Sequence, residues 1–128
     1  MAYQPLPNYL RTFRRRFGFS QKEIAALLGS ASGTKVSRYE NCARLPNLNT
    51  VWAYEVVFRR PASELFAGTY GTIATAVQGR AQDLIDQLRL LPPQALSPDV
   101  ERKLALLQSI IESKPHDTLR SHAGNHDD

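Results

Sequence analysis

Apolar residues along this chain recur mainly at spacings of three and four, the period of amphipathic helices. The first expected helix starts near Asn8, after an arm that contains two prolines, and stops at Gly18. Its apolar face consists of Leu6, Leu10, Phe13 and Phe17. Its other face carries Arg11, Arg14, Arg15 and Arg16. The same period continues through most of the chain, so the pattern predicts an all-α fold.

Residues 19–41 begin with the boundary signals of a short helix. Ser20 can cap this helix, and Glu23 can complete a capping box with it. Gly29 can adopt the left-handed conformation that ends the helix. Ala25 lies in its middle and is small enough to let a second helix cross closely.

That second helix is expected over about residues 33–41. Ser32 can cap it, and Val36 and Tyr39 would point inward. Two capped helices joined by a glycine turn, at a steep crossing angle, make a helix-turn-helix motif.

The ordered features of this stretch are Ser20-Gln21, Ala25, Gly29 and the run Val36-Ser37-Arg38-Tyr39-Glu40-Asn41. Together they resemble the helix-turn-helix of the Cro and phage-repressor family, also called the xenobiotic-response-element family of regulators. The likeness extends from about Leu10 to Phe66. The spacing from Gly29 to Val36 is one residue longer than the family's commonest spacing, and we place the extra residue at positions 30–32. The resemblance implies a five-helix DNA-binding domain.

Two further helices would complete that domain, which we expect over residues 1–71. The fourth, over about residues 48–58, has on or near one face Leu48, Val51, Trp52, Glu55 and Phe58. We expect Glu55 to accept hydrogen bonds from a loop or to pair with an arginine. A short fifth helix would start at Pro61 and end near Phe66, because Gly68 and Gly71 break the pattern.

Residues 72–113 are expected to form a helical hairpin with a proline turn at Pro92-Pro93. The first seam is heptad-like: Val77, Ala81, Leu84, Leu88 and Leu91. The second helix, capped by Ser97, has the seam Val100, Leu104, Leu107 and Ile111, widened by Leu106 and Ile110. Two helices cannot bury both seams alone. The hairpin therefore packs on the first domain or on a second copy, and DNA binding through two half-sites favours the homodimer.

Residues 114–128 are polar and aperiodic, which predicts a disordered tail. Its three histidines lack an ordered frame, so we expect no metal site there.

Charge is divided unevenly along the chain. Residues 1–66 hold ten Lys/Arg against four Asp/Glu, a net +6, whereas residues 67–128 hold six against eight, a net −2. A basic first half is the electrostatic footprint of a nucleic-acid binder.

The resemblance also implies roles for individual residues. If the second helix of the motif enters the major groove, the base-contacting candidates are Thr34, Lys35, Ser37 and Arg38. The phosphate-contacting candidates are Gln21, Lys22, Arg14 and Arg44. In the family, an arginine at the position of Arg14 pairs with a glutamate at the position of Glu40. This ion pair would orient the first helix against the third.

We therefore expect a homodimeric, sequence-specific regulator of transcription that binds double-stranded DNA, most simply a repressor. The alternative is a helical adaptor or an antitoxin that binds a protein partner through residues 72–113. Since the sequence contains no phosphate loop, metal quartet or nucleophile-base set, we expect neither an enzyme nor a cofactor. A single cysteine, Cys42, suggests a reducing cytoplasm, and no apolar run suggests a membrane span.

Overall fold

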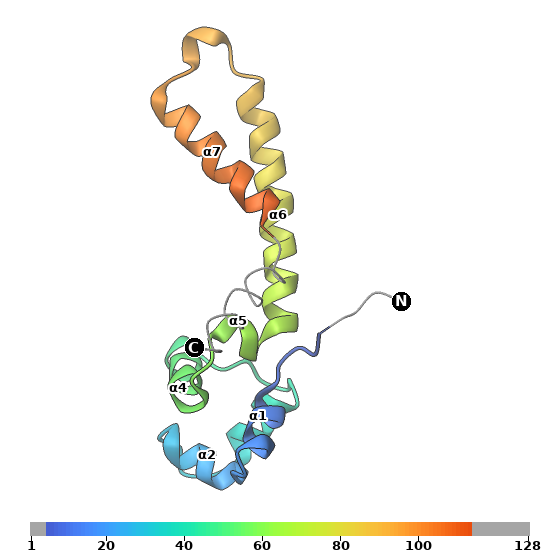
Figure 1. Cartoon of the computed structure of the whole chain (residues 1–128), viewed down its shortest axis with the longest axis vertical. Helices are drawn as coiled ribbons and strands as arrows, with labels where there is room; N and C mark the ends of the chain where they lie inside the picture. The colour runs from blue at the N-terminus through green and yellow to red at the C-terminus, as the bar shows by residue number, and fades with distance from the viewer. Residues whose placement is uncertain (1–4, 114–128) are drawn as a thin grey trace, which may run out of the picture. The chain divides into compact units, whose positions relative to one another are not determined.

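The computed structural model describes residues 5–113 of the 128-residue chain, and these contain helices but no strand (Figure 1). The helices are α1 (Leu10–Arg16), α2 (Gln21–Leu27), α3 (Thr34–Glu40), α4 (Leu48–Phe58), α5 (Ala62–Leu65), α6 (Ala67–Arg89), the 3-10 helix η1 (Pro93–Ala95) and α7 (Pro98–Glu112). The expected all-α class is confirmed for this part of the chain. The chain divides into two compact units, Met1–Tyr70 and Gly71–Asp128, and the division falls within α6.

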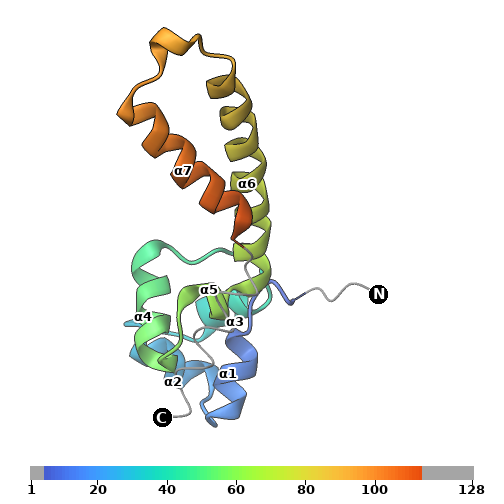
Figure 2. The same ribbon diagram turned by 45° about the horizontal axis from the view of Figure 1, so that its top comes forward.

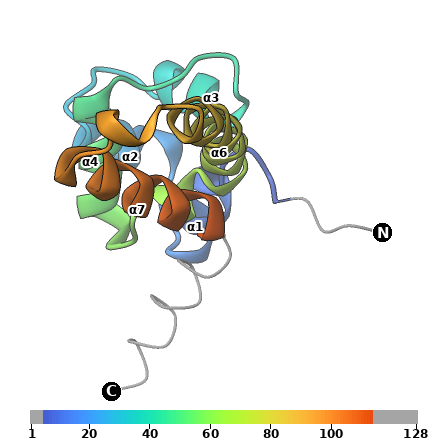
Figure 3. The ribbon, with the colours of Figure 1, turned by 90° about the horizontal axis from the view of Figure 1, so that it is seen from above.

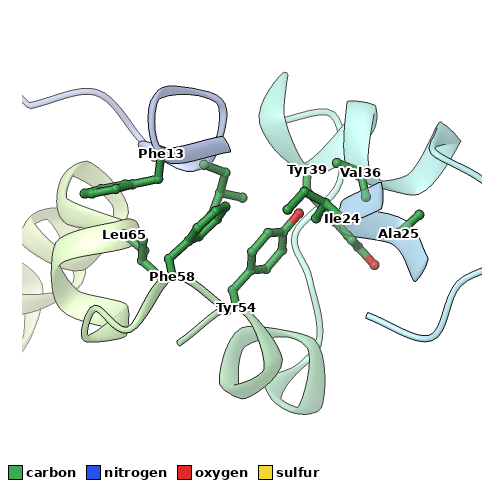
Figure 4. Packing of buried hydrophobic residues seen from close by; sticks show 9 residues of the cluster. Phe13, Ile24, Ala25, Val36, Tyr39, Tyr54, Phe58 and Leu65 are labelled. Carbon is green, nitrogen blue, oxygen red and sulfur yellow. The ribbon is translucent and has the colours of Figure 1, made fainter. Parts of the chain in front are cut away.

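The core of unit 1 receives side chains from each of its first five helices (Figure 4). Its buried members are Leu10, Phe13, Ile24, Ala25, Val36, Tyr39, Tyr54, Phe58 and Leu65. The Tyr54 ring lies between two others, with its centroid 5.9 Å from that of Phe58 and 6.3 Å from that of Tyr39. Burying a large apolar side chain contributes about 1.5–3 kcal/mol. Since helices this short are marginal alone, the shared core is what keeps them helical.

The boundaries of α2 follow the sequence signals. Glu23 N–H donates to Ser20 Oγ at 3.1 Å, and Ser20 N–H donates to Glu23 Oε1 at 2.9 Å, so the expected capping box is confirmed. Gly29 has φ +81°, as a helix-ending glycine in the left-handed region requires.

The start of α3 differs from the prediction. The N-cap is Gly33 rather than Ser32, and no side chain caps the helix. A Cβ on Gly33 would lie 3.2 Å from Gln21 Cβ and 3.3 Å from Lys22 N. The position at which α3 begins is therefore set by its close approach to α2, and not by a capping side chain.

The inward face of α4 was predicted only in part. Phe58 is buried as expected, and Val51 and Glu55 are partly buried. Leu48 and Trp52 are exposed instead, and the other buried residue is Tyr54. The helix is apolar on more than one side, so the period of its apolar residues did not identify the buried side. Glu55 accepts a hydrogen bond as expected, but its donor at 2.5 Å is the N–H of Ala62, the first residue of α5, and not a loop residue.

Gly68 and Gly71 do not interrupt the helix, as had been expected, because α6 starts at Ala67 and runs through both. Gly68 instead lies against the N-terminal arm. Its N–H donates to the carbonyl oxygen of Leu6 at 2.9 Å, and a Cβ at this position would lie 2.8 Å from Pro7 Cα and would meet the Leu6 oxygen. Glycine is needed here for contact between two backbones.

In unit 2, α7 turns back beside α6 after η1 (Figures 1 and 2). Seen along α6, α7 crosses it obliquely (Figure 3). The two helices diverge toward η1 (Figure 1). They meet near the C-terminal end of α7, where Gln78 Nε2 donates to the carbonyl oxygen of Ile110 at 3.1 Å and also to that of Ser113. Ser97 caps α7 as expected.

The buried face of α6 is rotated about the helix axis relative to the predicted apolar seam. Ala81 and Ile85 are buried, and Val100 of α7 is buried as well. Of the other predicted seam residues, Leu88 is mostly buried, whereas Val77 is 40% exposed and Leu84 42%. Leu91, which is 37% exposed, lies beyond the end of α6 at Arg89. Because α7 crosses obliquely, it covers only part of the apolar face of α6, and an apolar strip that includes Val77 and Leu84, one heptad apart, stays partly exposed.

We expect Gly68→Ala to destabilise the chain relative to Gly71→Ala. A methyl group at position 68 meets the arm backbone, and such overpacking costs about 1–3 kcal/mol. No atom lies within 4 Å of a Cβ placed on Gly71, so the control keeps only the helix-propensity gain of alanine. Thermal and urea unfolding of both variants would measure the difference. Equal stability of the two would contradict the backbone contact.

Candidate nucleic-acid interface

The carboxylate of Glu40, at the end of α3, is a shared hydrogen-bond acceptor for α1 and α2. Arg14 donates to it twice, from Nε to Oε2 at 2.6 Å and from Nη2 to Oε1 at 3.1 Å. Gln21 Nε2 donates to Oε1 at 3.2 Å. The Glu40 side chain is only 1% exposed and that of Arg14 12%. The expected ion pair is therefore present, and it is nearly excluded from water.

Both members of this pair are charged at neutral pH. Burial raises the pKa of the Glu40 carboxyl, but the hydrogen bonds from Arg14 and Gln21 and the charge of Arg14 outweigh it, so the pKa lies below its ordinary value. The hydrogen bond to Glu40 likewise raises the pKa of Arg14. Arg14 Nη1 also donates to the carbonyl oxygen of Phe19 at 3.0 Å, which fixes the turn between α1 and α2.

Tyr54 of α4 contributes a hydroxyl to the same interior, which the sequence reasoning missed. It is buried, and its hydroxyl oxygen has no hydrogen-bond partner among the described residues. Burial, and secondarily the charge of Glu40, raise the pKa of this phenol. The hydroxyl is therefore neutral, and leaving it unpaired costs about 1–3 kcal/mol.

The four residues proposed for base contact lie on α3, which they share with the buried Val36 and Tyr39. Thr34, Lys35 and Arg38 are exposed, and Ser37 is partly buried. Within the described part of the chain, the side chains of Lys35 and Arg38 have no hydrogen bond or ion pair. These long polar side chains are free to bind another molecule.

The four residues proposed for phosphate contact do not behave alike. Lys22 on α2 and Arg44 in the loop after α3 are exposed. Arg14, in contrast, is almost buried and directs three nitrogens at protein acceptors. Gln21 is partly buried and gives one amide hydrogen to Glu40. Lys22 and Arg44 are therefore available to a phosphate. Arg14 and Gln21 instead donate mainly to acceptors within the protein.

Two further polar residues extend this surface, Arg11 and Asn41, and neither was assigned a role in the site from the sequence. Asn41 caps the end of α3, and its Oδ1 accepts a hydrogen bond of 2.6 Å from Arg11 Nη2. Asn41 Nδ2 lies 3.5 Å from Ser37 Oγ. In the sequence, Arg11 could not be distinguished from the other three arginines of the first helix. Its acceptor, Asn41, lies thirty positions further along the chain, and only the fold brings the two together.

A scan of the chain against protein-family models gave no match. Searches of curated proteins and of solved structures also found no match. Over residues 5–113, no group of three or more His, Cys, Asp or Glu side chains could hold a metal ion. No helix in that range combines the length and apolar character needed to cross a membrane. The functional interpretation therefore depends on the residues themselves.

We expect Arg14→Met to destabilise the chain by about 3–5 kcal/mol, because it leaves the buried Glu40 carboxylate without its main partner. The double variant Arg14→Met/Glu40→Met should recover most of that loss, since no buried charge remains. A double-mutant cycle from urea unfolding would measure the coupling. If the free-energy losses of Arg14→Met and Glu40→Met add in the double variant, the two side chains are not coupled and the buried pair does not stabilise the arrangement of α1 and α3.

Proposed function

We propose that the chain is a sequence-specific DNA-binding regulator of transcription, in which α2 and α3 form a helix-turn-helix and α3 enters the major groove. The main support is the contrast between the two faces of α3. Val36, Tyr39 and Glu40 are engaged in the interior, while Lys35 and Arg38 point outward without a partner among the described residues. A short polar helix held rigidly by its other face suits direct readout of base edges.

Arg38 is the residue we assign to base recognition first. A free guanidinium can donate to the O6 and N7 acceptors of a guanine, and a bidentate contact of this kind contributes about 1–3 kcal/mol of discrimination. Thr34 begins α3 and suits a thymine methyl or a phosphate, while Lys35 and Ser37 complete the outward face. Lys22 and Arg44 supply phosphate contacts, which add affinity without sequence preference.

Unit 2 serves, in this proposal, to join two copies. Val77 and Leu84 lie one heptad apart on α6, Leu91 follows just beyond the end of the helix, and all three remain partly exposed. A strip of this kind suits helix–helix association with a second copy. Two linked domains would recognise two half-sites, and occupancy of such an operator would block a promoter, which makes repression the simplest outcome.

A second candidate, a protein-interaction adaptor or antitoxin, is favoured by a different observation. Leu48, Trp52 and Val56 are exposed at successive helical turns of α4, and Leu45 in the preceding loop is exposed too. Apolar groups gathered in this way are more common at protein interfaces than on a surface that meets only water. The outward face of α3 is polar, however, and this is why we place DNA binding first.

The DNA proposal predicts an enriched, twofold-symmetric site when the chain is used to select from random duplex DNA. Arg38→Ala should relax the preference at one position in each half-site and weaken binding there by about 1–3 kcal/mol. Arg80→Ala, which removes an exposed arginine of unit 2, is the matched control and should leave the selected site unchanged. If the unaltered chain enriches no DNA sequence in this selection, the DNA-binding function is rejected and the adaptor is favoured.

The dimer proposal predicts that Leu84→Glu shifts the chain toward monomer in sedimentation equilibrium. A charge within the exposed strip of α6 would be desolvated on association. Affinity for the symmetric site should then fall about 10²–10⁴-fold, because the two half-sites are no longer bound by linked domains. Val56→Glu makes the same kind of change on the exposed apolar surface of α4; if it and not Leu84→Glu abolishes the dimer, the copies associate through α4 instead. A chain that is monomeric at every concentration would rule out the dimer.

A further inference from the structure

Arg11 lies on α1 and is held beside the end of α3. Its Nη2 donates to Asn41 Oδ1 at 2.6 Å, and its Nε lies 3.5 Å from Glu40 Oε1. The side chain is nevertheless 47% exposed. A guanidinium has five N–H donors, and those on Nη1 have no acceptor in the described part of the chain. Arg11 is therefore a positioned cation with donors still available.

Arg14, one helical turn further along α1, has the opposite character. Its Nε and Nη2 are directed at Glu40 and its Nη1 at the Phe19 carbonyl oxygen, and its side chain is 12% exposed. A contact with DNA would require Arg14 to give up part of this pairing. Arg11 can make the same contact while keeping both of its acceptors.

We propose that Arg11, and not Arg14, is the α1 residue that binds a DNA phosphate, with Asn41 and Glu40 as its positioning residues. This inference rests on the function proposed above. It moves one phosphate contact from a buried arginine to an exposed neighbour.

The position of Asn41 supports a phosphate as the ligand. Asn41 directly follows α3, and its Nδ2 lies 3.5 Å from Ser37 Oγ, one of the residues assigned to base contact. A helix in the major groove has sugar-phosphate backbone along both sides, and contacts to it fix the register of the helix. The planar guanidinium fork matches two phosphate oxygens. Because Asn41 and Glu40 already hold the fork, less side-chain freedom is lost on binding.

The salt dependence of binding to the selected DNA site tests whether the charge of Arg11 contacts a phosphate. Each phosphate contact contributes about −0.9 to the slope of log affinity against log salt. Arg11→Ala should remove about one contact in each half-site, or two in the dimer, so that the loss of affinity between about 50 mM and 200 mM salt becomes about twelvefold smaller. Arg80→Ala should leave the slope unchanged. Both variants keep the bonds of Arg14 and Gln21 to Glu40, and thermal unfolding would verify that they fold.

The positioning role is tested by a double-mutant cycle with Asn41→Ala, which removes an acceptor but no charge. We expect Asn41→Ala alone to weaken binding about three- to tenfold per half-site with the salt slope nearly retained, in the range of one ordinary hydrogen bond. In the Arg11→Ala background the same change should have little effect. A purely structural role for Asn41 would give the same loss in both backgrounds.

The outcomes separate the two proposals. If the unaltered chain selects no site, the proposed function and this inference both fail. If it does select a site but Arg11→Ala leaves the salt slope unchanged, or the two substitutions are additive, only the assignment of Arg11 and Asn41 is overturned. A slope reduced by Arg11→Ala together with strong coupling to Asn41 supports it.

Discussion

A buried carboxylate must be compensated, and in unit 1 this requirement determines how three helices are arranged. Glu40 is 1% exposed, and an isolated charge in such a place would be very unfavourable. Arg14 from α1 and Gln21 from α2 both donate to it. The carboxylate can stay ionised only while α1, α2 and the end of α3 keep these positions. Such a pair adds little net stability compared with apolar packing, but it disfavours other arrangements of the same short helices.

Close backbone contacts impose a second constraint, and these depend on glycine. Gly33 lets the start of α3 approach α2, and Gly68 lets α6 approach the N-terminal arm. In the sequence, both glycines looked like local signals, one as part of a helix start and the other as a helix stop. Their actual role is tertiary. The sequence does not distinguish a glycine that ends a helix from one that makes room for a neighbouring backbone. Only the three-dimensional contact distinguishes the two.

The features that were predictable from the sequence are those with a local cause. The capping box of Ser20 and Glu23, the left-handed Gly29 and the cap at Ser97 depend on residues within a few positions of each other. The inward side of α4 and the partners of Arg11 depend on other helices. Helical period places Arg11 and Arg14 on the same side of α1, yet one is half-exposed and the other nearly buried. That difference is made by the acceptors on α3.

The proposed division of roles between the units is also consistent with the distribution of charge. Residues 1–66 carry a net +6, so direct association of two copies through this part would bring like charges together. Residues 67–128 carry a net −2, with both signs interspersed, and offer less repulsion to self-association. α6, which carries the partly exposed apolar strip with Val77 and Leu84, lies entirely within residues 67–128. Dimerisation through unit 2 would leave the basic residues of unit 1 free for phosphates, whose negative charge offsets the repulsion that the two domains would otherwise exert on each other.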